Sequence, residues 1–158
     1  MDSYYLIIKL LHILSAIVVM GTGAGIAFFM LMAVMSKNNT VIKSITNMVV
    51  LADWFFTFPF ALIQLLTGIW LMNYVGYSFQ SPWFKVVGFF YIFLMFAWFI
   101  VVWIQYRLKS LSQQQNFDVL TNLPFQRLFR YWFVLGVLGF TCIMIVFYYM
   151  VVKPARFF

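Results

Sequence analysis

The stretch VLADWFFTFPFALIQLLTGIW, residues Val50–Trp70, decides the class of fold because its apolar residues run far enough to cross a lipid bilayer. A membrane-spanning helix needs about 20 predominantly apolar residues. The same stretch contains Asp53, one of only three acidic residues in the chain. An ionisable side chain inside a membrane helix is energetically costly, so its presence points to a function.

The composition of the whole chain agrees with a lipid environment. Hydrophobic residues make up 66% of the 158 residues and charged residues 8%, whereas soluble domains contain roughly 45–50% apolar residues. A soluble domain of this size leaves too much of its surface exposed to hide so many apolar side chains. The sequence therefore predicts an all-α integral membrane protein. We expect one four-helix transmembrane bundle over residues 1–158, with spans at about 4–35, 45–75, 84–107 and 130–152.

The net charge of +7 comes from basic residues that flank the apolar runs. This placement favours the anionic head groups of membrane lipids as partners and gives no indication of nucleic-acid binding. One side of the membrane is predicted to hold Lys37, Lys43, Arg107, Lys109, Arg127 and Arg130. The other side is predicted to hold Lys9, Lys85, Lys153 and Arg156. Because cytoplasmic loops carry the excess of basic residues, both termini are expected outside the cytoplasm.

Polar side chains on the second span share one helical face. At 100° per residue, Thr57, Gln64 and Thr67 all lie within about 40° of Asp53. This face should turn away from lipid and toward the interior of the bundle. Similar stripes are predicted to face inward on the other spans. They are Tyr91, Trp98 and Gln105 on the third; Arg130, Thr141, Met144 and Tyr148 on the fourth; and His12, Val19, Gly23 and Met30 on the first.

Counting residues from the span ends divides these polar groups into two layers. His12, Gln64, Thr67, Tyr91 and Met144 should lie at one depth. Asp53, Gln105 and Arg130 should lie at another. In its layer Asp53 either pairs with Arg130 or Arg127 and fixes helix register, or handles a proton or a ligand. On the first span, Gly21 and Gly25 form a G-x-x-x-G pair of the kind that lets helices approach closely.

His12 is the only histidine in the chain. Inside a membrane helix it could ligate a haem iron, contact a quinone or another substrate, or simply pack against its neighbours. One histidine and one cysteine, Cys142, cannot supply the three or four ligands of a zinc or copper site. No motif for nucleotide binding and no catalytic triad is visible, so catalytic residues stay unknown.

Several motifs resemble a bacterial four-span membrane family of unknown function. They are IKLLHILSAIVVMGTGAG, LADWFFTFPFALIQLLTG (an ADW-FT-P----Q--TG pattern), PWFKVVGFFY, VVWIQYRL, RLFRYWFVLG and the late KP. That family is more distantly similar to copper-resistance protein D and to HemJ-type protoporphyrinogen oxidases. The resemblance implies a multi-pass protein of the bacterial inner membrane, with haem b at His12 and a porphyrinogen-oxidising or quinone-linked redox role.

The sequence and this resemblance thus predict a membrane protein that binds haem b and acts as an oxidoreductase. His12 would ligate the haem iron. Gln64 and Tyr91 would lie at the same depth in the membrane and contact the cofactor. The second axial ligand would be Met144, or a second His12 if two chains form a homodimer around one haem. The alternative is a non-enzymatic membrane subunit or a small transporter, in which Asp53 and its stripe line a polar path.

Overall fold

The computed structural model of the protein describes residues 2–153, and helices are its only regular secondary structure in that range. The elements are α1 (Ser3–Met35), α2 (Asn39–Ala52), the π-helical turn η1 (Asp53–Thr57), α3 (Phe58–Val75), α4 (Pro82–Ser112) and α5 (Leu123–Val152). Four helical segments are long and apolar enough to cross a membrane, because α2, η1 and α3 run on as one span over Asn39–Val75. The predicted all-α bundle of four transmembrane helices is confirmed.

The second span widens into η1 directly before Pro59. Proline has no backbone N–H to donate, and its ring clashes with the carbonyl four residues earlier, so an ordinary helical turn is disfavoured there. The chain responds with a wider turn, in which the N–H of Phe58 donates to the carbonyl of Asp53, five residues back. Such π-helical turns often occur at functional sites. Here the turn begins at the acidic residue itself.

The helices contain the four predicted spans and continue beyond several of their ends. Hydropathy marks the part of a helix that lies in lipid, whereas the helix itself runs to a capping residue. The side chain of Asn38 accepts hydrogen bonds from the backbone N–H groups of Thr40 and Val41 and so starts α2. Asn122 caps α5 by accepting from the N–H of Phe125 at 2.9 Å. α3 ends at Gly76, whose φ of 75° suits glycine.

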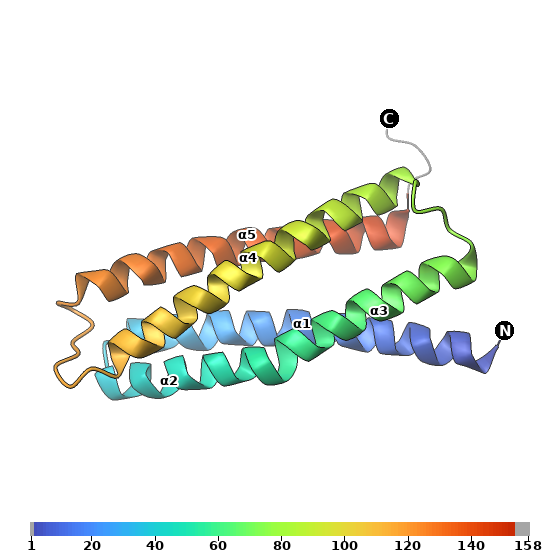
Figure 1. Cartoon of the computed structure of the whole chain (residues 1–158). Helices are drawn as coiled ribbons and strands as arrows, with labels where there is room; N and C mark the ends of the chain where they lie inside the picture. The colour runs from blue at the N-terminus through green and yellow to red at the C-terminus, as the bar shows by residue number, and fades with distance from the viewer. Residues whose placement is uncertain (1, 154–158) are drawn as a thin grey trace.

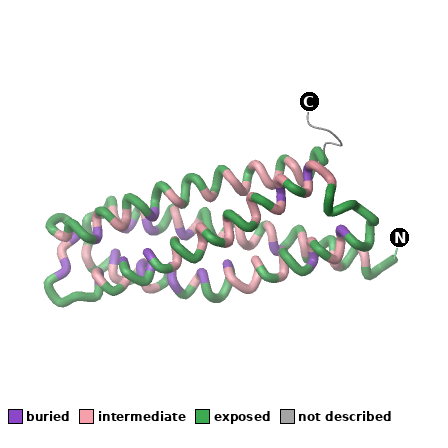
Figure 2. The backbone as a smooth tube through the Cα atoms, turned by 45° about the horizontal axis from the view of Figure 1, so that its top comes forward, coloured by how far each residue is buried: buried purple, intermediate pink, exposed green. Residues whose placement is uncertain are grey.

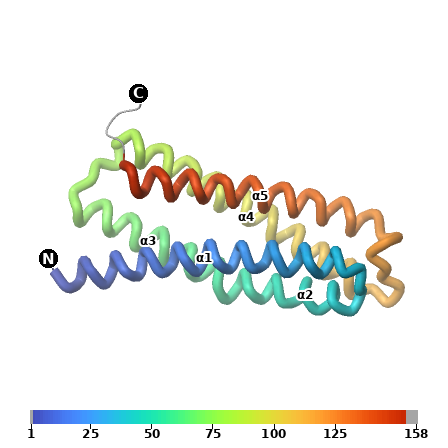
Figure 3. Tube along the Cα trace, turned by 180° about the vertical axis from the view of Figure 1, so that it is seen from behind, coloured from blue at the N-terminus to red at the C-terminus, as the bar shows by residue number. Residues whose placement is uncertain are grey.

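The helices form two antiparallel pairs (Figure 1). α1 packs along α3, α4 packs along α5, and α2 joins the pairs through its contacts with α1 and α4. Seen from behind, α1 lies along both α2 and α3 (Figure 3). The α1–α2 and α4–α5 connections lie at one end of the bundle, called here the two-loop end. The start of α1, the end of α5 and the α3–α4 loop lie at the other, the terminal end (Figure 1).

Burial is concentrated toward the two-loop end (Figure 2). Ile42, Leu108 and Phe125 have no exposed surface there, and the α4–α5 connection adds Phe117 and Val119 to the same core. A smaller cluster of Met72, Trp83 and Val87 closes the terminal end. The tight packing at the two-loop end fixes how α2 meets α4, which matters for the sites described below.

The outer surface of the bundle is apolar. Side chains such as Ile92 (72% exposed) and Phe55 (70% exposed) point outward along the spans. An apolar surface of this extent is not stable in water, so the bilayer is its solvent.

Three details of the predicted packing are wrong. On the first span, Gly23 is exposed, whereas Val19 and Met30 of the same predicted stripe are at least partly buried. The fourth-span stripe of Arg130, Thr141, Met144 and Tyr148 is exposed, because α5 packs on α4 through other positions. The G-x-x-x-G pair makes no close approach within the described chain, since a Cβ added at either glycine would meet no neighbouring group within 4 Å. Arg156, which entered the charge count, lies outside the described residues.

Candidate functional site

The first polar cluster surrounds His12, where α1 packs on α3. The Nδ1 atom of the imidazole lies 2.9 Å from the hydroxyl oxygen of Thr67. The Nε2 atom lies 3.1 Å from the side-chain nitrogen of Gln64. Both ring nitrogens are therefore within hydrogen-bonding distance of α3. The sequence placed these residues at one depth, and the structure brings them into direct contact.

The partners of His12 are themselves held in place. Ser15, one turn further along α1, donates its hydroxyl to the amide oxygen of Gln64 at 2.5 Å. Thr67 donates its hydroxyl to the carbonyl of Ile63 at 2.6 Å, which leaves its oxygen free to accept. All these contacts are satisfied together by a neutral imidazole that donates from Nδ1 to Thr67 and accepts at Nε2 from the amide of Gln64. We call His12, Ser15, Gln64 and Thr67 the histidine cluster.

The imidazole also packs directly on the backbone of α3. A Cβ added at Gly68 would lie 3.1 Å from the Cε1 atom of His12, tighter than an ordinary contact. Any larger residue at this position would push the ring a few tenths of an ångström away from the helix. The ring is fixed by a close apolar contact as well as by hydrogen bonds.

The second polar cluster surrounds Asp53 at the first position of η1. The residue is only 4% exposed, and the indole Nε1 of Trp98 lies 3.5 Å from one carboxyl oxygen. The side chains of Thr57 and Gln105 also lie beside the carboxyl group. Asp53, Thr57, Trp98 and Gln105 form the aspartate cluster, which joins η1 to α4.

The hydrogen bonding of the aspartate cluster is incomplete. Among the described residues, Asp53 Oδ2, Thr57 Oγ1 and Gln105 Oε1 are all buried without a hydrogen-bond partner. Buried polar atoms in proteins almost always have a partner, and each exception calls for an explanation. Three such atoms lie in this one cluster, although the side chains of Thr57 and Gln105 are close enough to the carboxyl group to stabilise its charge.

Asp53 has no basic partner among residues 2–153. The predicted pairing with Arg130 or Arg127 is not formed, since the polar groups at the carboxyl are those of Thr57, Gln105 and Trp98. Both arginines are exposed. They lie on α5, whose main packing partners are α4 and α1. An ionised carboxylate buried without a counter-ion is strongly disfavoured, whereas the neutral acid is tolerated.

Further polar contacts continue along the second span and extend the two clusters into a line. The hydroxyl of Tyr91 donates to the carbonyl of Ala61 at 2.9 Å, between the clusters in sequence. Toward the two-loop end, the hydroxyls of Thr46 and Ser112 lie 2.9 Å apart and join α2 to α4. We call this line of groups the polar seam. On the second span it consists of Thr46, Asp53, Thr57, Gln64 and Thr67.

The surroundings of His12 do not fit a haem as the side chains lie. An axial imidazole needs one free ring nitrogen, and here Thr67 and Gln64 occupy both. Met144, the predicted second ligand within the chain, is 47% exposed on α5. The third predicted member of the site, Tyr91, bonds to the backbone of Ala61 and not to the histidine cluster. Haem ligation by His12 requires the side chain of Gln64 to move away.

The structure reveals partners that the sequence did not indicate. Ser15 orients Gln64, although a serine at this position gives no signal beyond its spacing from His12. Trp98 was placed on the inward face of its span, and the structure shows its indole directed at Asp53. Thr46 and Ser112 were missed because a paired hydroxyl cannot be recognised before the neighbouring helix is known.

The fold and the two clusters define a four-span helical membrane protein with ionisable side chains inside its bundle. The chain belongs to the family described as predicted integral membrane protein (DUF2269), whose family model matches residues 6–154. No curated protein and no solved structure matches the chain. The distant likeness to copper-resistance protein D and to HemJ-type enzymes stays a prediction.

Proposed function

We propose that this membrane protein binds and releases protons at Asp53, and that it acts as a small transporter or as a subunit of one. The observation that carries the proposal is the set of three buried polar atoms without partners around one carboxyl group, on Asp53, Thr57 and Gln105. Ionisable residues inside membrane spans commonly mark proton or ion pathways.

The chemistry of the aspartate cluster suits a proton. A carboxyl group without a counter-ion can be protonated and stay neutral in the bilayer. Trp98 donates to one carboxyl oxygen, which stabilises the anion when the proton leaves. The second oxygen, Oδ2, has no partner among the described residues and is the atom at which a proton would arrive. The hydroxyl of Thr57 and the amide of Gln105 can hold a passing water molecule beside it.

His12 is the second proton-binding group on the polar seam. In the neutral form of the imidazole, Nδ1 donates to Thr67 and Nε2 accepts from the amide of Gln64. When a proton binds Nε2, the amide of Gln64 can rotate and present its oxygen to that nitrogen. The amide nitrogen then donates to Ser15, whose hydroxyl donates in turn to the carbonyl of His12, 2.9 Å away. Both protonation states therefore have a complete set of hydrogen bonds.

The two groups are too far apart for direct proton exchange. Gln64 follows Asp53 by 11 residues, or about 16 Å at 1.5 Å per residue. Thr57 and Tyr91 lie on this section of the seam and offer hydroxyl groups between the two ends. Transfer along the seam would require water molecules between these hydroxyls.

Proton flux into vesicles tests the proposal. The protein is reconstituted with a pH-sensitive dye inside, and a pH gradient is applied with valinomycin and potassium to balance charge. We expect flux above that of empty vesicles, and we expect Asp53→Asn to abolish it. Asp118→Asn is the matched control. It replaces the same acid by the same amide, but in the α4–α5 connection and not in the polar seam. Wild-type flux at the level of empty vesicles, or full flux in Asp53→Asn, would refute the proposal.

The second candidate is the haem-dependent redox role, favoured by the single intramembrane histidine and the sequence resemblance. The side chain of Gln64 would first have to move away from His12 before the imidazole could ligate a haem iron. Absorption spectroscopy after expression with ample haem separates the candidates. A Soret band that His12→Ala removes would establish haem b. Half a haem per chain would indicate a homodimer, and a quinone or porphyrinogen would then be the substrate to test. A colourless protein would remove the haem-dependent role and leave the flux measurement to decide on proton binding.

We also propose that the protein lies in the bacterial inner membrane with both termini on the periplasmic side, from the distribution of basic residues. A periplasmic reporter fused after residue 158 should be active, and a tag inserted near Gln114 should be reached only from the cytoplasm. The opposite pattern would reverse the orientation while leaving the polar seam as described.

A further inference from the structure

A shallow, open polar pocket lies between α2 and α4 at the two-loop end, next to the Thr46–Ser112 end of the polar seam. It has a volume of about 460 Å³. Its polar lining consists of Thr40, Lys43, Ser44, Asn47, Lys109 and Gln113. The four residues from α2 follow each other at helical spacing on one face, and the two from α4 are one turn apart. We call this cavity the two-lysine pocket.

The position of the two-lysine pocket is fixed by contacts that join α2 to α4. The side-chain nitrogen of Gln113 donates to the backbone carbonyl of Lys43 at 3.1 Å. Beside it, the buried hydroxyls of Thr46 and Ser112 lie 2.9 Å apart. Both helices are therefore held where their lysines line one cavity.

The charge of the pocket is uncompensated. Lys43 and Lys109 are both half-buried, and neither forms an ion pair within residues 2–153. The chain has only three acidic residues. Asp53 is buried in the aspartate cluster, and Asp118 accepts from Leu120 and Thr121 in its own loop. Two lysines that line one pocket attract an anion, and the hydroxyl and amide groups around them can donate to its oxygens.

The surface next to the pocket is apolar and points to an amphipathic ligand. Met48 lies on the pocket wall and is 57% exposed. Leu51 and Phe55 follow at helical spacing toward the membrane centre and are 48% and 70% exposed. Acyl chains can lie along these side chains while a head group occupies the cavity. Basic pockets between membrane helices bind anionic lipid head groups elsewhere.

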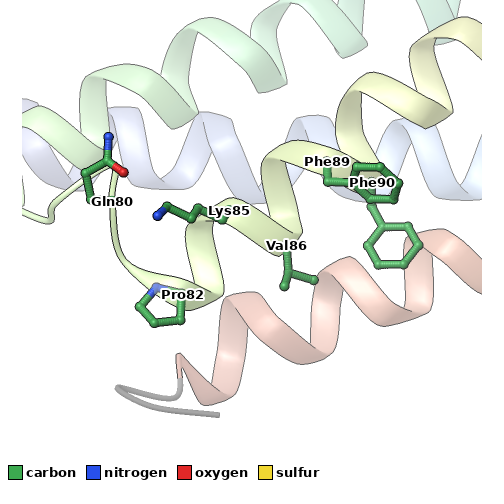
Figure 4. Close-up of a pocket in the computed structure, with 6 residues that line it drawn as sticks. All are labelled: Gln80, Pro82, Lys85, Val86, Phe89 and Phe90. Carbon is green, nitrogen blue, oxygen red and sulfur yellow. The ribbon is translucent and has the colours of Figure 1, made fainter.

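We propose that the two-lysine pocket is a specific site for an anionic phospholipid, whose phosphate lies between Lys43 and Lys109. A second cavity of similar volume, about 450 Å³, lies at the start of α4 and provides a comparison (Figure 4). Lys85 is its only basic residue, and Val86, Phe89 and Phe90 make its wall apolar. One charge should bind an anionic head group more weakly than two.

Thermal unfolding in neutral detergent tests the site. Dioleoyl phosphatidylglycerol, dioleoyl phosphatidylcholine or inorganic phosphate is titrated into the purified protein. We expect phosphatidylglycerol to raise Tm, with phosphatidylcholine and free phosphate producing little change. Since each lysine near a lipid surface contributes a factor of about five in binding, the Lys43→Gln/Lys109→Gln variant should bind phosphatidylglycerol about 30-fold more weakly.

The matched control is Lys85→Gln, which removes a lysine from the other cavity and should respond to phosphatidylglycerol like the wild type. Lys43→Arg/Lys109→Arg keeps both charges and should keep the response, which separates lost binding from lost folding. A double glutamine variant that responds like the wild type would overturn the proposal. Equal stabilisation by inorganic phosphate would overturn the assignment to a lipid.

Discussion

The histidine cluster and the aspartate cluster lie on the same polar seam, yet their hydrogen bonding differs. Each ring nitrogen of His12 has a partner on α3, and the partners are held in turn. Around Asp53, three buried polar atoms have no partner within the described residues. The bundle can therefore satisfy an ionisable side chain inside its spans, so the incomplete hydrogen bonding at Asp53 does not follow from its position in a membrane helix alone. The difference makes Asp53 the main candidate for proton exchange in the function proposed above, while His12, the second proposed proton-binding group, is held in place by its partners.

The largest effect on stability is expected at the complete cluster. His12→Ala removes the partner of the Gln64 side-chain nitrogen and leaves that half-buried group unsatisfied. The free energy of unfolding should fall by about 1–3 kcal/mol. Titration with sodium dodecyl sulfate in mixed micelles, followed by circular dichroism, measures this change. Replacing Gln64 by leucine in the same variant should cost little more, because the two residues act together. Fully additive losses would show that they do not.

A smaller effect is expected at Gly68, where the His12 ring meets α3. Alanine stabilises a helix interior over glycine by about 1 kcal/mol, and Gly136→Ala on α5 should show this gain because a Cβ there meets nothing within 4 Å. Gly68→Ala should not show this gain in stability, because the Cβ of the new alanine would lie 3.1 Å from the Cε1 atom of His12. We expect Gly68→Ala to be less stable than Gly136→Ala by about 1–2 kcal/mol in the same assay. Equal stabilities would contradict a fixed ring.

The smallest effect on stability is expected at the open cluster. Asp53→Asn replaces a neutral acid by an amide of the same shape, so the free energy of unfolding should change by less than about 1 kcal/mol. Arg130→Gln should be equally mild, since no ion pair is lost. Breaking a buried ion pair would instead cost about 3–5 kcal/mol. A loss of that size in both single variants, with little added in the double variant, would restore the Asp53–Arg130 pair.

The fold was largely predictable from the sequence because lipid imposes a simple pattern. Apolar runs longer than the bilayer is thick can only be helices, so the four spans were readable without a structure. The π-helical turn was not predicted, although Pro59 marked the place where the second span departs from a regular helix. Periodicity predicts which residues share a face. It does not predict which helix that face meets.

The same limit explains the outcome at the candidate site. On the second and third spans, the faces that carry Asp53 and Gln105 do turn inward, because polar side chains were dense enough to define them. On the fourth span the stripe with Arg130 and Met144 contained many apolar residues around it, and the prediction of an inward face was wrong. Depth alone suggested an Asp53–Arg130 pair. The structure shows that α5 packs mainly on α4 and that Arg130 is exposed.

Infrared difference spectroscopy of the reconstituted protein, recorded while pH is stepped between acid and alkali, tests most directly whether Asp53 exchanges a proton inside the bundle. We expect a carboxylic acid C=O band that appears on acidification, shifts in deuterium oxide, and is missing in Asp53→Asn but present in Asp118→Asn. A difference spectrum of Asp53→Asn identical to that of the wild type would show that Asp53 does not exchange a proton.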